Sequence, residues 1–227
     1  DVAAALADPA ALVAEVAAWL ALVEALPACV AAVVAEVAAA VGNPMDPSGS
    51  PMLGGLDVLP NGIRDDSAAS PIGCLGAVMP FMRVVYEQGD IRAAAWQGFS
   101  RFGTGATVSS VDAGVVGFGS NAEAQRMFDV FAAQWRGCQG TTVTTHLPIG
   151  ELHATVTDVR TDGHILSATI RNGDAGDADS FPTEHAVGVA GSYIVDVDAA
   201  VTAGAPAERV ATGRAIRLAT VMLDKID

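Results

Sequence analysis

Apolar residues fill most of the first 42 positions, and their spacing predicts two helices. Asp8-Pro9 is a helix start, because an N-cap residue is followed by proline at the first helical position, and Pro27 begins the second helix. Both helices are apolar on nearly all sides, which is typical of helices that are buried or packed against a partner. We therefore interpret residues 1–34 as an apolar helical hairpin that extends the main domain, and residues 1–42 as a candidate docking surface for a partner protein.

The segment after these helices, residues 43–73, is rich in proline and glycine. This composition predicts a long loop, with one edge strand near residues 56–63, since proline within a sheet is confined to its edges. Loops of this length are usually functional or disordered. The segment is therefore a candidate cover for a groove.

The clearest local signal in the chain is the start of a helix at Ser120, which follows a valine-rich strand predicted over residues 106–118. Ser120 followed by Glu123 is a capping box, and Gly137 marks the end of the helix. The apolar positions between them recur at helical spacing and predict one buried face. This face consists of Ala124, Met127, Phe128, Phe131 and Trp135.

The rest of the chain alternates β-branched segments with turn residues, a pattern that predicts antiparallel strands. Four strands are expected, over residues 141–145, 151–160, 164–171 and 184–199. A last helix follows Gly204-Ala205-Pro206. Helices, a strand, a helix, four strands and a helix form an α+β fold, in which an antiparallel β-sheet packs with α-helices. We assign this fold to residues 35–227.

Charge excludes several partners. Acidic residues outnumber basic ones 26 to 12, for a formal net charge of −14. Nothing basic is dense enough to replace phosphate counterions, so nucleic acid is excluded as a partner, and an anionic membrane surface is disfavoured. The longest charge-free stretch in the apolar helices, Ala25–Ala35, is far shorter than the roughly 20 residues that span a bilayer. Because the chain begins at Asp1 without a basic leader, we expect any signal peptide or lipid-anchor cysteine to lie upstream.

The sequence carries no motif for catalysis. HExxH, CxxC and GxSxG patterns are absent, and Gly117-Phe118-Gly119 lacks the third glycine and the later acidic residue of a dinucleotide site. The four histidines are not at metal-ligand spacing; they are His146, His153, His164 and His185. We therefore expect a protein that is not an enzyme and that binds no cofactor and no metal.

Two groups of aspartates are candidate metal ligands. Asp174–Asp179 does not match the ligand positions of an EF-hand loop, so a solvated turn is expected. Asp196 and Asp198 alternate on one strand face, where paired carboxylates can hold a metal or share a proton. Because antiparallel strands often have one wet face, we expect both carboxylates to face water.

The chain has three cysteines, and the simplest arrangement of an odd number is one bridge and one free thiol. Cys29 lies among valines and alanines, where it behaves as a small buried apolar residue. Cys74 follows the proline-rich loop and Cys138 ends the predicted amphipathic helix. A bridge forms more easily at such irregular positions, but these positions alone do not settle the pairing.

Several stretches of the chain, taken in order, resemble a known family. They are SPIGCLGAVM (70–79) with Tyr86 after it, SSVDAGVVGFGSNAEAQRMFDVFAAQWRGCQGTTV (109–143), EHAVGVAGSYIVDVDAAV (184–201) and the closing LDKI. Their order and spacing are similar to those of the PknH-like extracellular sensor domain family of mycobacteria. Members of that family form the outer part of a receptor serine/threonine kinase, or occur as free-standing envelope lipoproteins.

The resemblance implies an α+β domain outside the cytoplasmic membrane, with helices around an antiparallel sheet and a groove proposed to bind an unidentified ligand. It also implies that Cys74 and Cys138 form a disulfide, which requires oxidising surroundings. The second cysteine pair of the family would fall at about Thr183 and Ala200, so this chain lacks that bridge. The apolar helix before Pro27 is not part of the family pattern.

The leading hypothesis is a non-enzymatic ligand-binding or sensor-type module of the mycobacterial cell envelope, either lipid-anchored or secreted, whose ligand is a small molecule or an envelope component. The alternative is an accessory or structural subunit of a membrane-associated envelope complex, which docks through the N-terminal helices. Polar and aromatic groups orient a ligand in an apolar cleft. The candidates for this role are Tyr86, Trp96, Arg101, His153 and His185.

Overall fold

The structure, a computed structural model, describes residues 34–103, 105–148, 150–173, 181–202 and 213–226. The strands are β1 (Asp46–Gly54), β2 (Ala69–Ser70), β3 (Ile91–Ser100), β4 (Val108–Phe118), β5 (Thr142–Leu147), β6 (Gly150–Asp162), β7 (Ile165–Asn172), β8 (Phe181–Ala190) and β9 (Tyr193–Val201). The helices are one over residues 34–41, the short 3-10 helices η1 (Leu56–Val58) and η2 (Ile72–Cys74), α2 (Leu75–Val78), α3 (Arg83–Tyr86), α4 (Asn121–Cys138) and α5 (Arg214–Leu223).

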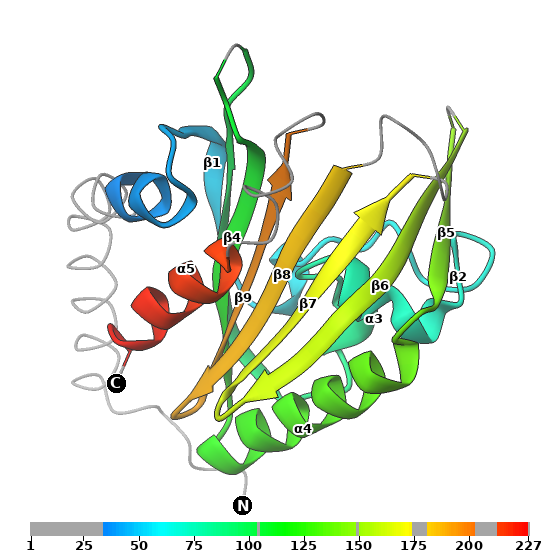
Figure 1. The fold of residues 1–227 in the computed structure, drawn as a ribbon. Coiled ribbons are helices and arrows are strands. Elements are labelled where there is room, and N and C mark those ends of the chain that lie inside the picture. The colour runs from blue at the N-terminus through cyan, green and yellow to red at the C-terminus, as the bar shows by residue number, and fades with distance from the viewer. Residues whose placement is uncertain (1–33, 104, 149, 174–180, 203–212, 227) are drawn as a thin grey trace, which may run out of the picture.

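These strands form one antiparallel sheet with the spatial order β1-β3-β4-β9-β8-β7-β6-β5-β2 (Figure 1). Strands β5 to β9 follow one another as neighbours, and β3 pairs with β4. The pair β4–β9 joins these two parts of the sheet. The α+β class predicted from the order of elements is therefore confirmed.

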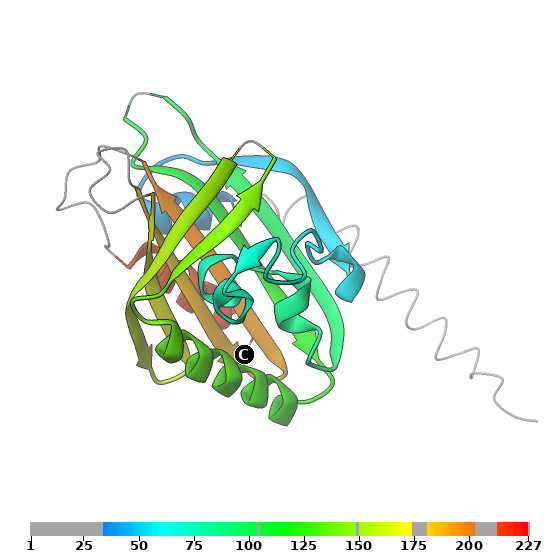
Figure 2. The same cartoon turned by 90° about the vertical axis from the view of Figure 1, so that its right-hand side faces the viewer.

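Helices cover both faces of the sheet (Figures 1 and 2). The helix over residues 34–41 and α5 lie on one face, where they pack on valines and alanines of β4, β8 and β9. The other face, turned toward the viewer in Figure 2, carries α2, α3 and α4 over a cluster that includes most of the buried aromatic rings. Each face has its own hydrophobic core, so every helix depends on the sheet for burial of its apolar side.

Helix α4 follows the sequence pattern closely. The Oγ of its N-cap residue, Ser120, accepts a hydrogen bond from the backbone N–H of Glu123 at 3.2 Å. The Glu123 carboxylate accepts from the backbone N–H of Asp90 (3.2 Å) and from the Arg126 guanidinium, and so fastens the start of α4 to the segment before β3. All five predicted core positions are buried: Ala124, Met127, Phe128, Phe131 and Trp135.

Before β4, the strands differ from the sequence prediction. β1 lies at residues 46–54, inside the predicted loop, and the edge strand expected near residues 56–63 is instead η1 and a following irregular segment. β1 is an edge strand of mostly exposed proline, glycine and serine, so no hydrophobic alternation marks it. The sequence did not predict β3, because its run Ala93–Ala95 has little strand preference.

The single strand expected over residues 184–199 is wrong. This segment forms parts of two strands, β8 and β9, joined by a turn in which Gly191 has a φ of +53°. Both strands are covered on both faces, so neither shows the alternation that would mark where the first one ends. The strands predicted over residues 106–118, 141–145, 151–160 and 164–171 are confirmed, and the last predicted helix is confirmed as α5. The region of the predicted N-terminal hairpin up to residue 33, Cys29, and the stretch Asp174–Asp179 lie outside the described residues.

Cys74 of η2 and Cys138 of α4 form a disulfide, with an S–S distance of 2.04 Å and Cα atoms 5.7 Å apart. This is the pairing that the family resemblance implies. Thr183 of β8 and Ala200 of β9 are direct partners in the sheet. The two positions where the family resemblance implies a second cysteine pair are therefore neighbours in the sheet, and they hold a threonine and an alanine.

Candidate functional site

Successive residues of a strand point to opposite faces of a sheet, and β8 carries two buried ionisable residues in succession. Glu184 faces α5: its carboxylate accepts hydrogen bonds from the backbone N–H groups of Arg214 and Ala215, and from the Arg214 guanidinium at 2.9 Å. His185 faces the opposite layer, with its ring centroid 4.5 Å from that of Trp135 in α4. One strand thus fixes a helical layer on each face of the sheet.

His185 belongs to a buried hydrogen-bond network that joins the sheet to α2 and α3. Its Nε2 lies 2.8 Å from Oδ1 of Asp196, and its Nδ1 lies 2.9 Å from the backbone oxygen of Ala77. Oδ2 of Asp196 accepts hydrogen bonds from the Tyr86 hydroxyl (2.7 Å) and from the backbone N–H of Phe81 (3.2 Å). His185 is 1% exposed, and Asp196 and Tyr86 are each 2% exposed. The network therefore lies in the interior.

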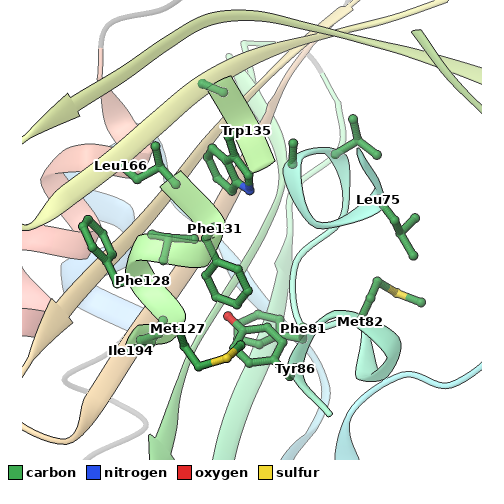
Figure 3. Close-up of a cluster of buried hydrophobic side chains, with 14 of the residues drawn as sticks. Leu75, Phe81, Met82, Tyr86, Met127, Phe128, Phe131, Trp135, Leu166 and Ile194 are labelled. Atoms are coloured by element: carbon green, nitrogen blue, oxygen red, sulfur yellow. The ribbon is translucent and has the colours of Figure 1, made fainter. Parts of the chain in front are cut away.

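Aromatic rings pack around the network. Tyr86 packs edge-on against Phe131 of α4, with ring centroids 5.2 Å apart, as Figure 3 shows. Phe81 stacks on Trp96 of β3 with a centroid distance of 5.7 Å. Burial, and then the charge and hydrogen bond of Asp196, raise the pKa of Tyr86 well above its usual value, so its hydroxyl remains a donor.

Two further carboxyl groups extend the network across the sheet. Asp112 of β4, Asp198 of β9 and His185 of β8 are direct neighbours in register, and Oδ1 of Asp198 accepts a hydrogen bond from the backbone N–H of Asp112 at 3.2 Å. Burial, and then the charge of Asp112, raise the pKa of Asp198 to about 7. Burial and the charge of Asp196 raise the pKa of Asp112. The expectation that both carboxylates face water is wrong for Asp196, which is buried under α2 and α3, whereas Asp198 is half-buried.

These raised pKa values make the stability of the domain depend on pH. Aspartate in an unfolded chain titrates near about 3.9, so the folded protein holds the proton of Asp198 more tightly from about pH 4 to pH 7. The stabilisation that the folded state gains by binding this proton is fully present below about pH 4 and is lost as the pH rises through about 7. We expect Asp198→Asn to match the wild type at about pH 4 and to exceed it at about pH 8 by roughly 1–4 kcal/mol in urea unfolding.

The control for this measurement is Asp162→Asn, a change at an exposed carboxyl at the end of β6. It should follow the wild type at both pH values. If Asp198→Asn lost as much stability as the wild type between the two pH values, the assignment of the titrating group to Asp198 would be refuted.

A surface groove lies beside the buried network, between η2, α2, α3 and α4. Its volume is about 360 Å³, which is within the range of small-molecule sites. We call it the α2–α4 groove. Its lining combines apolar side chains and glycines with three polar side chains: Ile72, Gly73, Gly76, Val84, Val85, Glu87, Gln88 and Gln134.

Gly76 and Val85 separate the α2–α4 groove from the network. Both residues line the groove, and both also border a small internal void that Tyr86 and Asp196 line from the other side. A Cβ atom at Gly76 would lie only 2.8 Å from Cγ1 of Val85, so glycine lets the two short helices approach this closely. The groove wall is therefore part of the same segment, Leu75–Tyr86, that the network binds to the sheet; we call it the α2–α3 segment.

The structure brings together three of the five residues that the sequence proposes as ligand contacts. Tyr86 and His185 meet through Asp196 in the interior. Trp96 is half-buried nearby, where its ring stacks on Phe81 and its Nε1 donates to the backbone oxygen of Val58 at 3.1 Å.

The other two candidates lie elsewhere. Arg101, just beyond the end of β3, is exposed and pairs with Asp46 at 3.1 Å. His153 lies on β6, with its Nε2 3.5 Å from the Glu151 carboxylate. Within the described residues, none of the five candidates lines the α2–α4 groove.

Two other hollows are lined by described residues. One of about 520 Å³ lies among largely polar groups at the start of α4, the β8–β9 turn and the end of α5, and one of about 170 Å³ is lined by Glu184 and the candidate His185 near the start of α5. In the part of the chain that the structure describes, no cluster of histidine, cysteine and carboxylate side chains is suited to a metal ion. The helices of that part also include none with the length and apolar character needed to span a bilayer.

Comparisons with known proteins point to one family and one fold. The family model described as the PknH-like extracellular domain matches residues 23–225. A solved structure, the extracellular domain of PknH from Mycobacterium tuberculosis, is similar with a TM-score of 0.71 and 22% sequence identity, over 86% of this chain and 93% of that one. At this identity the likeness concerns the fold. A search of curated proteins finds no match.

Proposed function

Because the chain belongs to the PknH-like extracellular domain family, we propose that it is a non-enzymatic sensor-type module that binds a small molecule in the α2–α4 groove. The observation that carries this proposal is the position of the groove, whose wall is the α2–α3 segment that the buried network ties to the sheet. A ligand seated there would contact a segment that three hydrogen bonds attach to Asp196 and His185 of the sheet.

An extracytoplasmic location is supported by the family and by the disulfide, since such bridges persist in oxidising compartments. We propose that the module acts in the mycobacterial cell envelope, either lipid-anchored or secreted. Mass spectrometry of the mature protein tests how it is anchored, because a lipid anchor adds mass to the chain.

A non-enzymatic role is supported by where the ionisable groups lie. A general base or acid must come within hydrogen-bond distance of its substrate. His185, Asp196 and Tyr86 converge, but they bind one another and the α2–α3 segment, and they are almost without solvent exposure. Their arrangement serves the attachment of that segment rather than chemistry on a substrate.

The lining of the groove indicates the kind of ligand. Ile72, Val84 and Val85 offer apolar surface, while Gln88 and Gln134 offer amide groups that donate and accept. The Glu87 carboxylate is held by both Nη atoms of Arg64, at 2.8 and 2.9 Å, so its charge is already paired. We therefore expect an uncharged ligand with one apolar side and hydroxyl or amide groups.

The experiment maps where small probes bind. Isopropanol, phenol and glucose are titrated separately into methyl-labelled protein, and shift changes are expected at the methyl groups of Ile72, Val84 and Val85. Gly73 lines the groove and has open space where a side chain would begin. Gly73→Phe should therefore fill the groove and remove these changes without affecting the fold.

The matched control is Gly62→Phe, because Gly62 has equal space and does not line the groove. This variant should keep the shift changes of the wild type. Probe binding that clusters instead at the hollow formed by Val189 of β8 and Leu223 of α5, or that survives in Gly73→Phe, would refute the site.

A further inference from the structure

We propose that the protonated His185–Asp196 pair is a latch that holds the α2–α3 segment against the sheet, and that loss of its proton as the pH rises loosens this segment. The proposal goes beyond ligand binding; its consequence for the α2–α4 groove rests on the proposed function, while the latch itself rests on the hydrogen bonds of the pair.

The hydrogen-bond geometry fixes the number of protons on the pair. Nδ1 of His185 lies 2.9 Å from the backbone oxygen of Ala77, which only accepts, so Nδ1 carries a hydrogen. Nε2 lies 2.8 Å from Oδ1 of Asp196, a distance that requires a second hydrogen between them. The pair therefore holds one proton more than a neutral imidazole beside a carboxylate.

The remaining oxygen of Asp196 cannot hold this proton. Oδ2 already accepts hydrogen bonds from the Tyr86 hydroxyl (2.7 Å) and from the backbone N–H of Phe81 (3.2 Å). Together with Ala77, these residues place three hydrogen bonds between the α2–α3 segment and two side chains of the sheet. Without this proton, one ring nitrogen of His185 has only a lone pair, which faces a lone pair of its oxygen partner at 2.8 or 2.9 Å in a buried site. This repulsion is relieved if the α2–α3 segment moves away from the sheet.

The groups around the pair favour the protonated state. Asp198 and Asp112 lie in register beside His185 on β9 and β4, and Tyr86 faces Asp196 from α3. From α4, the described residue in contact is Trp135, which does not titrate. Burial lowers the pKa of His185, but the charges of Asp196 and Asp198 and the bonds to Asp196 and Ala77 raise it above the ordinary value. The latch is therefore closed at acidic pH and opens as the pH rises through a pKa above that of an ordinary imidazole.

Nuclear magnetic resonance tests the proton count and the movement separately. Nitrogen-15 spectra should show both ring nitrogens of His185 protonated at about pH 6 and the loss of one of these protons at higher pH, with exposed His164 as the surface histidine for comparison. Amide exchange, corrected for the intrinsic effect of pH, should show the protection of Phe81 and Met79 falling at least about tenfold between about pH 6 and about pH 9. The amides of Arg217 and Asp224, bonded within α5, should keep their protection.

Asp196→Asn tests the charge of the partner. The amide oxygen can still accept from the imidazole, but the doubly protonated ring loses its counter-charge. Because the amide nitrogen that replaces Oδ2 cannot accept from Phe81, the protection of Met79, whose N–H donates to the backbone oxygen of Leu75, is followed instead. Loss of Met79 protection should occur at a pH lower by more than about one unit, while His164→Gln leaves the profile unchanged.

A singly protonated His185 ring at about pH 6 overturns the latch, and so does a Phe81 protection that is constant with pH or that falls in parallel with that of α5. The wild-type nitrogen spectrum decides the question even if Asp196→Asn fails to fold. None of these measurements uses a ligand, so failure of the probe mapping in the groove leaves their outcome unaffected.

Discussion

Replacing both cysteines of the Cys74–Cys138 bridge with serine is expected to lower the free energy of unfolding by about 2–5 kcal/mol. The bridge joins residues 64 positions apart in the sequence, and the chain-entropy model gives about 4 kcal/mol for a loop of this length. The effect should be near the upper part of the range because Thr183 and Ala200 stand where the family resemblance implies a second cysteine pair, so no bridge between β8 and β9 shares the constraint.

Urea unfolding of the oxidised wild type and the double variant measures this loss. Cys29→Ser is the control, since it keeps the bridge, and it should cost less. Alkylation without reductant after denaturation should add one label to the wild type, on Cys29. Three labels, or a double variant that unfolds at the wild-type urea concentration, would contradict the account.

A second large effect is expected at the ion pair that attaches α5 to the sheet. The side chains of Arg214 and Glu184 are 5% and 7% exposed, and the Glu184 carboxylate also accepts the first N–H groups of α5. Removing one partner of a buried pair strongly destabilises a protein, because the other charge stays buried. We expect Glu184→Ala to lower the free energy of unfolding by about 3–5 kcal/mol.

The matched variant replaces both partners, with Glu184→Leu and Arg214→Met. Apolar residues of similar size leave no buried charge, so this double variant should lose only about 1–2 kcal/mol, mainly from the missing helix cap. Urea unfolding again provides the measurement. If the double variant were as unstable as Glu184→Ala, the loss would come from packing and the role assigned to the ion pair would be wrong.

A feature of the fold can be predicted from the sequence when residues close together in the chain determine it. It cannot be predicted when the determining residues are far apart in the chain. Helix α4 is predictable because its cap at Ser120 and its apolar spacing are local, and both are confirmed. The division between β8 and β9 is not, because both strands are covered on two faces and lack alternation. The edge strand β1 is hidden for the opposite reason, since its proline and serine residues are largely exposed.

The same distinction applies to the candidate site. The sequence proposes Tyr86 and His185 as ligand contacts, but their meeting through Asp196 depends on pairing across strands and on the placement of α2 and α3. Asp196 carries the weakest signal of the three, because alternation with Asp198 also fits a wet strand face. In the groove wall, Gly76 is the sequence signal for the close approach of α2 and α3, because a Cβ atom there would lie 2.8 Å from Cγ1 of Val85.

The central claim is that the α2–α4 groove binds a small molecule, and native mass spectrometry of protein purified from a mycobacterial envelope fraction tests it most directly. The wild type and Gly62→Phe should carry the same additional small-molecule mass, which disappears on denaturation, whereas Gly73→Phe should carry none. A wild type without any bound molecule, or a Gly73→Phe variant that keeps it, would contradict the account.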